Sequence, residues 1–133
     1  MIVLDASAAV DWLLQTPAGQ SIDQRIYRSH GQTETLHTIH LIDVEFAQVL
    51  RRLVREGTLT TRRAKDAIED LIALRLTRYA PALLLKRIWQ LRQNLTAYDA
   101  AYVALAEELK APLITRDRRI AAAPGHAAAV EVF

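Results

Sequence analysis

Two acidic residues stand where predicted β-strands end and helices begin. Asp5 follows the apolar run 1–4, and Asp117 follows the apolar run 112–115 after a single arginine. The carboxyl ends of parallel strands meet at one edge of a sheet, which is where α/β proteins bind their ligands. Each acid alone could simply cap the helix that follows, and Ser7 could share that role at the first helix. Two acids at the same edge favour a functional site.

Glu45 borders the buried face of a predicted helix. On a helical wheel it lies about 60° from the centre of an apolar stripe. That stripe consists of Ile42, Phe46, Val49 and Leu53. An ionised side chain in this position is costly unless it has a partner. A salt bridge to Arg52 is the structural alternative to a functional role. Asp43, on the far side of the stripe in the first turn, is interpreted as structural because it suits the helix dipole.

Asp99 gives the sharpest single signal in the chain. It lies about 60° off a second helical stripe. That stripe consists of Tyr98, Tyr102, Leu105 and Leu109. The alternative interpretation is a capping box, because Thr96 and Asp99 match the pattern in which a hydroxyl and an acid three residues later cap a helix. A capping acid can also direct an oxygen into a cleft, so the two interpretations are compatible.

These four acids together predict a site for a hard divalent cation. Carboxylates a few ångströms apart raise one another's pKa values, and a bound cation offsets that repulsion. Oxygen ligands select Mg²⁺ or Mn²⁺, which activate water and neutralise charge on a phosphoryl group. Zinc is disfavoured because the chain has no cysteine, and because His37 and His40 straddle a predicted strand-to-helix junction with no third ligand nearby.

The elements that must position these acids alternate along the chain. Strands are expected at 1–4, 35–39, 79–80, 112–115 and 130–133. Helices are expected at 7–14, 19–28, 41–56, 60–74, 82–92, 96–109 and 118–123, with Gly57 ending the third. Strands separated by helices imply a parallel sheet covered on both faces. We therefore expect an α/β sandwich in which residues 1–133 form a single domain.

Composition excludes several classes of protein. The chain has 133 residues, of which 51% are hydrophobic and 24% charged, as in an ordinary globular domain. The absence of cysteine excludes a disulfide scaffold and a cysteine nucleophile. No apolar run approaches the ~20 residues that a membrane span needs. No secretory signal precedes the first strand, so a cytoplasmic protein is expected. With four glycines and no phosphate-loop motif, nucleotide-binding loops are also excluded.

Three stretches resemble one known family. They are VLDASAAVDWLL, HLIDVEFAQVLRRLVREGTLT and LTAYDAAYVALAEELKAPLITRD. Their order and spacing resemble a PIN-domain protein of the VapC toxin type, over essentially the whole chain. The resemblance implies a PIN-like three-layer sandwich and a metal-dependent endoribonuclease, whose products would carry a 5′-phosphate and a 3′-hydroxyl. It also implies a homodimer and a cognate VapB-type antitoxin that blocks the cleft.

The resemblance assigns roles to individual residues. The family's acidic metal-binding quartet corresponds to Asp5, Glu45, Asp99 and Asp117, with Mg²⁺ or Mn²⁺ as the implied cofactor. Ser7 and Thr115 match hydroxyl positions near those acids. Some members carry a further acid after the last of the four, where this chain has Arg118 and Arg119. A fully occupied second metal site is therefore not implied.

The charge balance fits an RNA substrate. The net charge is +2, and 14 of the 17 cations are arginines, which suit bidentate phosphate contacts. Without the four site acids, 17 cations face 11 anions, so a basic rim would bind RNA with a salt-dependent affinity. Arg116, Arg118 and Arg119 are the candidates for phosphate contacts, and ordinary exposed arginines are the alternative.

Two other functions remain open. The same acidic cleft could serve a metal-dependent phosphatase or DNA nuclease, although an aspartyl-phosphate enzyme would need a second acid where Ser7 stands. The chain could also be a catalytically silent PIN-fold binding or regulatory module, against which the presence of all four acids speaks. For the antitoxin, Trp12 and Leu13 are predicted as apolar anchors on the early helices.

Overall fold

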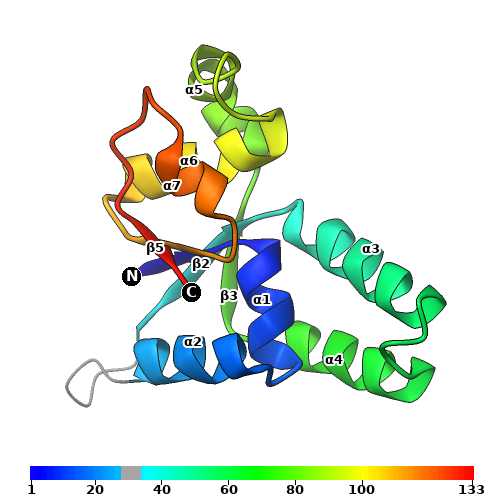
Figure 1. Cartoon of the computed structure of the whole chain (residues 1–133). Coiled ribbons are helices and arrows are strands. Elements are labelled where there is room, and N and C mark those ends of the chain that lie inside the picture. Colours follow the sequence, from blue (N-terminus) through cyan, green and yellow to red (C-terminus); the bar gives the residue numbers. More distant parts are fainter. Residues whose placement is uncertain (28–33) are drawn as a thin grey trace.

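Five parallel strands form the centre of the structure, a computed structural model that describes residues 1–27 and 34–133 (Figure 1). The strands are β1 (Ile2–Leu4), β2 (Leu36–Ile39), β3 (Leu76–Tyr79), β4 (Leu113–Thr115) and β5 (Val130–Val132). Their order is β3-β2-β1-β4-β5, and every pairing is parallel. The prediction of a helix-covered parallel sheet is confirmed. The predicted helix end at Arg28 lies outside the described residues.

Helices cover both faces of this sheet. They are α1 (Ala6–Leu13), α2 (Pro17–Tyr27), α3 (Ile42–Arg55), α4 (Thr61–Ala73), α5 (Leu85–Gln90), α6 (Ala97–Leu109) and α7 (Arg118–Ala122), with a 3-10 turn at Pro81–Leu84. In Figure 1, α1 to α4 lie together on one side of the strands and α5 to α7 on the other. The molecule therefore has three layers.

The central strand β1 supplies both layers of core. Ile2 and Leu4 belong to the apolar cluster that α1 to α4 cover, whereas Val3 belongs to the cluster under α5 and α6. All three side chains are completely buried. A strand that is buried on both faces needs an apolar run without alternation. The sequence of β1 has this pattern, and both of its faces are buried.

The first two helices pack so closely that they bury the predicted antitoxin anchors. A Cβ at Gly19 would stand only 1.9 Å from the carbonyl oxygen of Asp11, so only glycine permits this approach of α2 to α1. Trp12 is 4% exposed and donates its indole N–H to Asp23 at 2.8 Å, and Leu13 is also buried. The prediction that Trp12 and Leu13 are surface anchors is wrong, because both side chains belong to the apolar core that α1 to α4 share.

Other predicted boundaries differ from the structure in instructive ways. The strand expected at 79–80 is β3, which begins three residues earlier because it pairs with β2 from Leu76 onward. The expected helix at 82–92 is a 3-10 turn followed by the short α5. Gly57 ends α3 as predicted, with a φ of +75° that favours glycine. Within residues 1–27 and 34–133, no helix has the length and hydrophobicity to span a membrane.

Candidate active site

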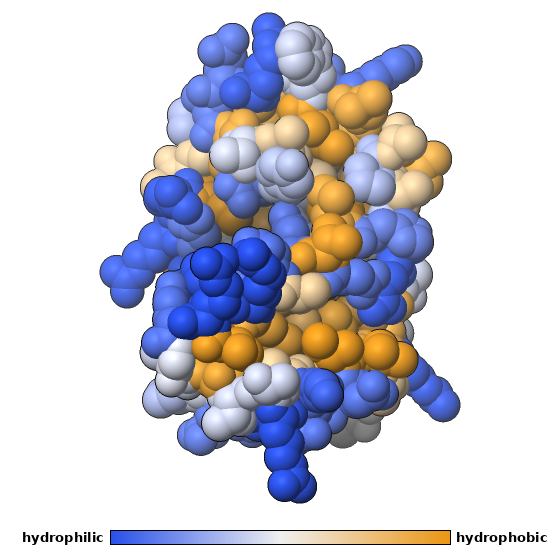
Figure 2. All heavy atoms as spheres, turned by 90° about the vertical axis from the view of Figure 1, so that its right-hand side faces the viewer, coloured by the Kyte–Doolittle hydropathy of each residue, from blue (hydrophilic) through white to orange (hydrophobic). Residues whose placement is uncertain are grey.

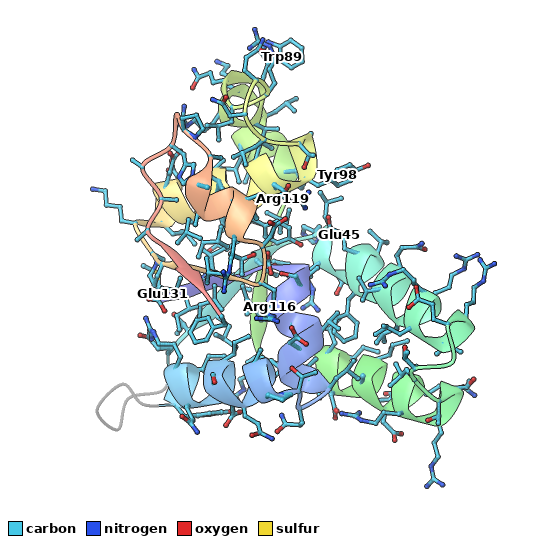
Figure 3. The ribbon with its side chains drawn as sticks, viewed as in Figure 1. Glu45, Trp89, Tyr98, Arg116, Arg119 and Glu131 are labelled. Carbon is cyan, nitrogen blue, oxygen red and sulfur yellow. The ribbon has the colours of Figure 1, made fainter. Side chains whose placement is uncertain are left out.

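The four predicted acids line one cleft at the carboxyl edge of the sheet. Asp5 follows β1, Glu45 lies in the first turn of α3, Asp99 in the first turn of α6, and Asp117 precedes α7. The cleft has a volume of about 390 Å³, and Tyr102 also lines it. Figure 3 shows Glu45 and Arg119 near the space between α3 and the helices on the other side of the sheet. Residues 112 positions apart in the chain thus border the same space.

Asp5 lies at the buried end of the cleft. Its side chain is 5% exposed, and its Oδ1 accepts hydrogen bonds from the Ser7 hydroxyl at 2.7 Å and the Ala8 amide at 2.8 Å. Its Oδ2 accepts a hydrogen bond of 2.5 Å from Thr115. Burial raises the pKa of Asp5 to about 6, while the hydrogen bonds from Thr115, Ala8 and Ser7 oppose that rise. The carboxylate is oriented by neutral donors and has no cationic partner in the described part of the chain.

The cap of the first helix is Asp5 itself. Its carboxylate accepts the Ala8 amide, and its backbone is extended as an N-cap requires. The prediction that Ser7 caps this helix is wrong, because Ser7 lies within the first turn of α1. Its hydroxyl donates to Asp5 and accepts the backbone N–H of Arg116 at 3.0 Å. Ser7 therefore connects Asp5 to the chain segment that carries Asp117.

Glu45 has a partner that sequence reasoning missed. The Tyr102 hydroxyl donates to Glu45 Oε2 at 2.6 Å, across from α6 to α3. The predicted alternative, a salt bridge from Glu45 to Arg52, is wrong, because Arg52 pairs with Glu56 one turn further along α3. Burial raises the pKa of Glu45, the Tyr102 hydrogen bond lowers it, and the charge of Asp99 raises it again. The only signal in the sequence that could have pointed to Tyr102 as a site residue was its position one turn after Asp99.

Asp99 faces the cleft with its carboxylate free of hydrogen bonds within the described residues. The Thr96 hydroxyl accepts the Asp99 amide at 3.2 Å, which is one half of the predicted capping box. The reciprocal bond from the Asp99 carboxylate to the backbone of Thr96 is not formed in that part of the chain. The charge of Asp99 raises the pKa of both Asp5 and Glu45, so these three acids interact electrostatically. Of the predicted helical stripe, Tyr102 and Leu105 are buried, whereas Tyr98 is 59% exposed.

Asp117 is held by an arginine of its own helix. Arg119 donates from Nε at 3.0 Å and from Nη2 at 2.6 Å, and its backbone N–H also donates to Asp117. The guanidinium lowers the pKa of Asp117. The Arg119 side chain is 89% exposed, so little packing holds it in this position. Arg118 is exposed, and Arg116 pairs with Asp11 at 2.5 Å (Figure 3). Phosphate contacts by these arginines remain a prediction.

The donor set suits a hard cation, but the side chains are not yet arranged around one. Every candidate ligand is a carboxylate or hydroxyl oxygen, the donor type that Mg²⁺ and Mn²⁺ prefer. Asp5, Glu45 and Asp99 line the cleft, and none of the three forms a salt bridge within the described residues. As they stand, no three acidic or histidine side chains of residues 1–27 and 34–133 form a metal-holding group. Release of Asp117 from Arg119 and small rotations of the acids would be needed.

Two ribonucleases with similar sequences align with nearly the whole of this chain. Ribonuclease VapC9 of Mycobacterium tuberculosis is 44% identical over 120 residues, which cover 90% of this chain and 88% of that protein. Ribonuclease VapC12 of the same species is 39% identical over 132 residues, which cover 99% of this chain and 98% of that protein.

Solved structures share the fold. PAE2754 from Pyrobaculum aerophilum has a TM-score of 0.68 at 22% identity, covering 98% of this chain and 83% of that chain. VapBC2 from Rickettsia felis, solved with a DNA fragment from its promoter, has a TM-score of 0.68 at 13% identity, covering 99% of this chain and 98% of that chain. The sequence model of the PIN-domain family matches residues 2–125. The resemblance of the sequence motifs is confirmed: this chain belongs to the PIN-domain family of VapC ribonucleases.

Proposed function

We propose that this chain is the toxin of a type II toxin–antitoxin system, an endoribonuclease that cleaves RNA phosphodiester bonds with Mg²⁺ or Mn²⁺. The observation that carries the proposal is the convergence of four carboxylates on one cleft in a member of the VapC ribonuclease family. The ligands would be Asp5, Glu45, Asp99 and Asp117. When bound, the cation would activate water and offset charge on the phosphoryl oxygens.

The surrounding side chains orient these ligands. Ser7 and Thr115 donate to opposite oxygens of Asp5 and so fix the plane of its carboxylate. Tyr102 fixes one oxygen of Glu45 and leaves the other free. Because the donors are neutral, the negative charge of both acids is retained for a cation. Arg116, Arg118 and Arg119 lie beside Asp117 and are the proposed phosphate contacts at the rim, with Arg116 and Arg119 leaving their acidic partners to reach RNA.

The proposal includes partners and a compartment. We expect a cognate VapB-type antitoxin and a homodimer, acting in the cytoplasm. Exposed apolar side chains are available for such contacts around α5, where Leu83, Leu85 and Trp89 are more than half exposed. The expected products carry a 5′-phosphate and a 3′-hydroxyl, as the family resemblance implies.

A cleavage assay tests the proposed function. Purified protein is incubated with total RNA, with single-stranded DNA and with a phosphate monoester, each with Mg²⁺ or Mn²⁺ and again with EDTA. Cleavage of RNA alone, abolished by EDTA and restored by added Mn²⁺, is the expected result. Preference for DNA or for the monoester would indicate the nuclease or phosphatase alternative. No turnover of any substrate would indicate a binding module that retains the fold.

A further inference from the structure

A row of arginines on α3 begins where the acidic cleft ends. Gln48 lines the cleft and also a second hollow of about 330 Å³. The other residues that line this second hollow are Arg51, Arg52, Arg55 and Glu56. The two hollows therefore meet at Gln48, and both follow the same helix. We call Gln48, Arg51, Arg52 and Arg55 the α3 row.

The helix geometry aligns this row with Glu45. Residues three or four positions apart lie on one face of a helix, which relates Glu45 to Gln48, Gln48 to Arg51 and Arg52, and these to Arg55. At a rise of about 1.5 Å per residue, Arg52 lies roughly 10 Å and Arg55 roughly 15 Å along the axis from Glu45. Figure 2 faces the ends of α3 and α4 and shows hydrophilic side chains gathered in a dense group at mid-height. All four residues of the row are exposed, so the row leads away from the cleft across the surface.

Two of the three arginines of the row have no acidic partner within the residues that the structure describes. In the described part of the chain, acidic side chains pair with Arg25, Arg63, Arg78, Arg87, Arg116 and Arg119. On α3, Arg52 shares Glu56 at 3.3 Å, with both side chains about half exposed. Arg51 and Arg55 have no acidic partner among the described residues. Three guanidiniums therefore share one carboxylate.

Helix stability does not explain this arrangement. Like charges four positions apart, such as Arg51 and Arg55, weaken an isolated helix by a few tenths of a kcal/mol. The helix dipole favours cations in the last turn, which accounts for Arg52 and Arg55 but not for Arg51 or for the hollow between them. Unpaired guanidiniums that line a hollow are free to bind an anion bidentately.

We infer that the α3 row is a phosphate-binding track for single-stranded RNA that continues beyond the acidic cleft. The inference rests on the proposed ribonuclease function, which brings the scissile phosphate to Asp5, Glu45 and Asp99. From there the strand follows α3, with Gln48 at the junction and Arg51 and Arg55 binding phosphates a few nucleotides away. Substrate affinity therefore depends on RNA length, because a short RNA fills the cleft without reaching Arg55.

A charge-matched pair of double variants tests the track. Arg51→Gln with Arg55→Gln removes the unpaired cations of the row and retains a good helix former. Arg62→Gln with Arg75→Gln is the control, since these exposed arginines also lack an acidic partner in the described chain and lie off the row. Binding of a fluorescein-labelled oligoribonucleotide long enough to pass Arg55 is titrated in EDTA over a series of KCl concentrations. Cleavage of that RNA and of a trinucleotide is followed separately with Mn²⁺.

The expected result is specific to the row and to long RNA. The Arg51/Arg55 variant should bind the long RNA about tenfold more weakly, and its salt slope should be smaller by roughly 1.4, because two phosphates no longer have a guanidinium beside them. The KM for long RNA should rise, while the rate of trinucleotide cleavage stays at the wild-type value. The control variant should match the wild type in each measurement, and circular dichroism should show α3 intact in both.

Two outcomes would overturn the inference in distinguishable ways. If the wild type cleaves RNA and the two double variants bind it equally well with equal salt slopes, only the track fails. If the wild type cleaves no RNA with either ion, the proposed function fails and the track with it. Unchanged RNA binding together with a changed subunit mass in the Arg51/Arg55 variant would assign the row to a contact between subunits and would also overturn the inference.

Discussion

The hydroxyl of Tyr102 lies 2.6 Å from Oε2 of Glu45 and joins α6 to α3 beside the acidic cleft. Asp99 lies one turn before Tyr102 on the same helix, so α6 presents both a carboxylate and the donor that orients a second carboxylate. Burial and the hydrogen bond to Glu45 both raise the pKa of Tyr102, so its hydroxyl remains a donor throughout the physiological range. The hydrogen bond favours the ionised form of Glu45 and so opposes the effect of burial on its pKa.

Removal of this hydroxyl should shift the pH dependence of activity. The Tyr102 hydrogen bond lowers the pKa of Glu45, so Tyr102→Phe should raise that pKa and move the acid limb of the rate profile to higher pH. Stability at neutral pH should fall by about 1 kcal/mol, because the half-buried carboxylate loses its donor. Tyr98→Phe, which removes an exposed hydroxyl, is the control and should change neither quantity. An unshifted acid limb in Tyr102→Phe would show that Glu45 does not limit activity.

Substitution of the cleft acids should abolish activity without disturbing the fold. Asp5→Asn and Asp99→Asn each remove a charged ligand and keep the shape of the side chain, so both should abolish RNA cleavage while far-UV circular dichroism stays unchanged. Binding of Mn²⁺, followed by electron paramagnetic resonance, should weaken in both variants. Full activity in either folded variant would contradict the assignment of the site.

The buried charge of Asp5 should make metal-free stability depend on pH. Its pKa is about 6 in the folded protein against 3.8 for the free residue, so its contribution to stability is present below about pH 4 and is lost as pH rises through 6. Without metal, Asp5→Asn should therefore be more stable than the wild type at pH 8, by about 1 to 3 kcal/mol. Urea unfolding in EDTA at pH 4 and pH 8 measures the difference, which should shrink toward pH 4. The exposed Asp66→Asn should show no such trend.

The two acids of the α3 N-terminus were distinguishable from the sequence, but the partners of Glu45 were not. The stripe of apolar residues and Gly57 predicted a helix at 41–56, and the structure has it at Ile42–Arg55. Local spacing also indicated that Glu45 borders the buried face. The Tyr102 hydrogen bond depends on the packing of α6 against α3, which no local pattern encodes.

The start of edge strand β3 was also hidden in the sequence, because its residues are mostly polar and only Leu76 is buried there. That residues 1–133 form a single domain stays a prediction.

Substitutions on α3 test the assigned roles of those acids. Asp43 accepts hydrogen bonds from Nε and Nη2 of Arg78 at the exposed edge of β3. Asp43→Asn should therefore retain most activity and lose roughly 0.5 kcal/mol of stability, from the helix dipole and a solvent-exposed ion pair. Glu45→Gln should be inactive and equally well folded. RNA cleavage and thermal unfolding of the two variants are compared side by side, and the reverse pattern would mean that the wrong acid has been assigned to the site.

The contact between Arg119 and Asp117 indicates how an antitoxin would occupy the cleft. This guanidinium already binds Asp117 with two nitrogens, so the cleft accepts an arginine at its carboxylates. We expect an antitoxin arginine to enter near Asp5, Glu45, Asp99 and Asp117 and to compete with metal. Because Trp12 and Leu13 are buried, an apolar antitoxin residue should instead contact Val44, which is 65% exposed at the rim of the cleft.

Co-expression with the adjacent small reading frame tests this arrangement. The chain alone should arrest growth, and the neighbour should relieve the arrest and lower Mn²⁺ binding by the purified complex. Alanine in place of the cleft-binding arginine of the neighbour should restore Mn²⁺ binding, and Val44→Ala should weaken the complex without loss of RNA cleavage. A neighbour that neither binds nor relieves toxicity would remove the antitoxin from the proposal. Unimpaired growth without any inhibitor would count against the toxin itself, because an active ribonuclease harms the cell that makes it.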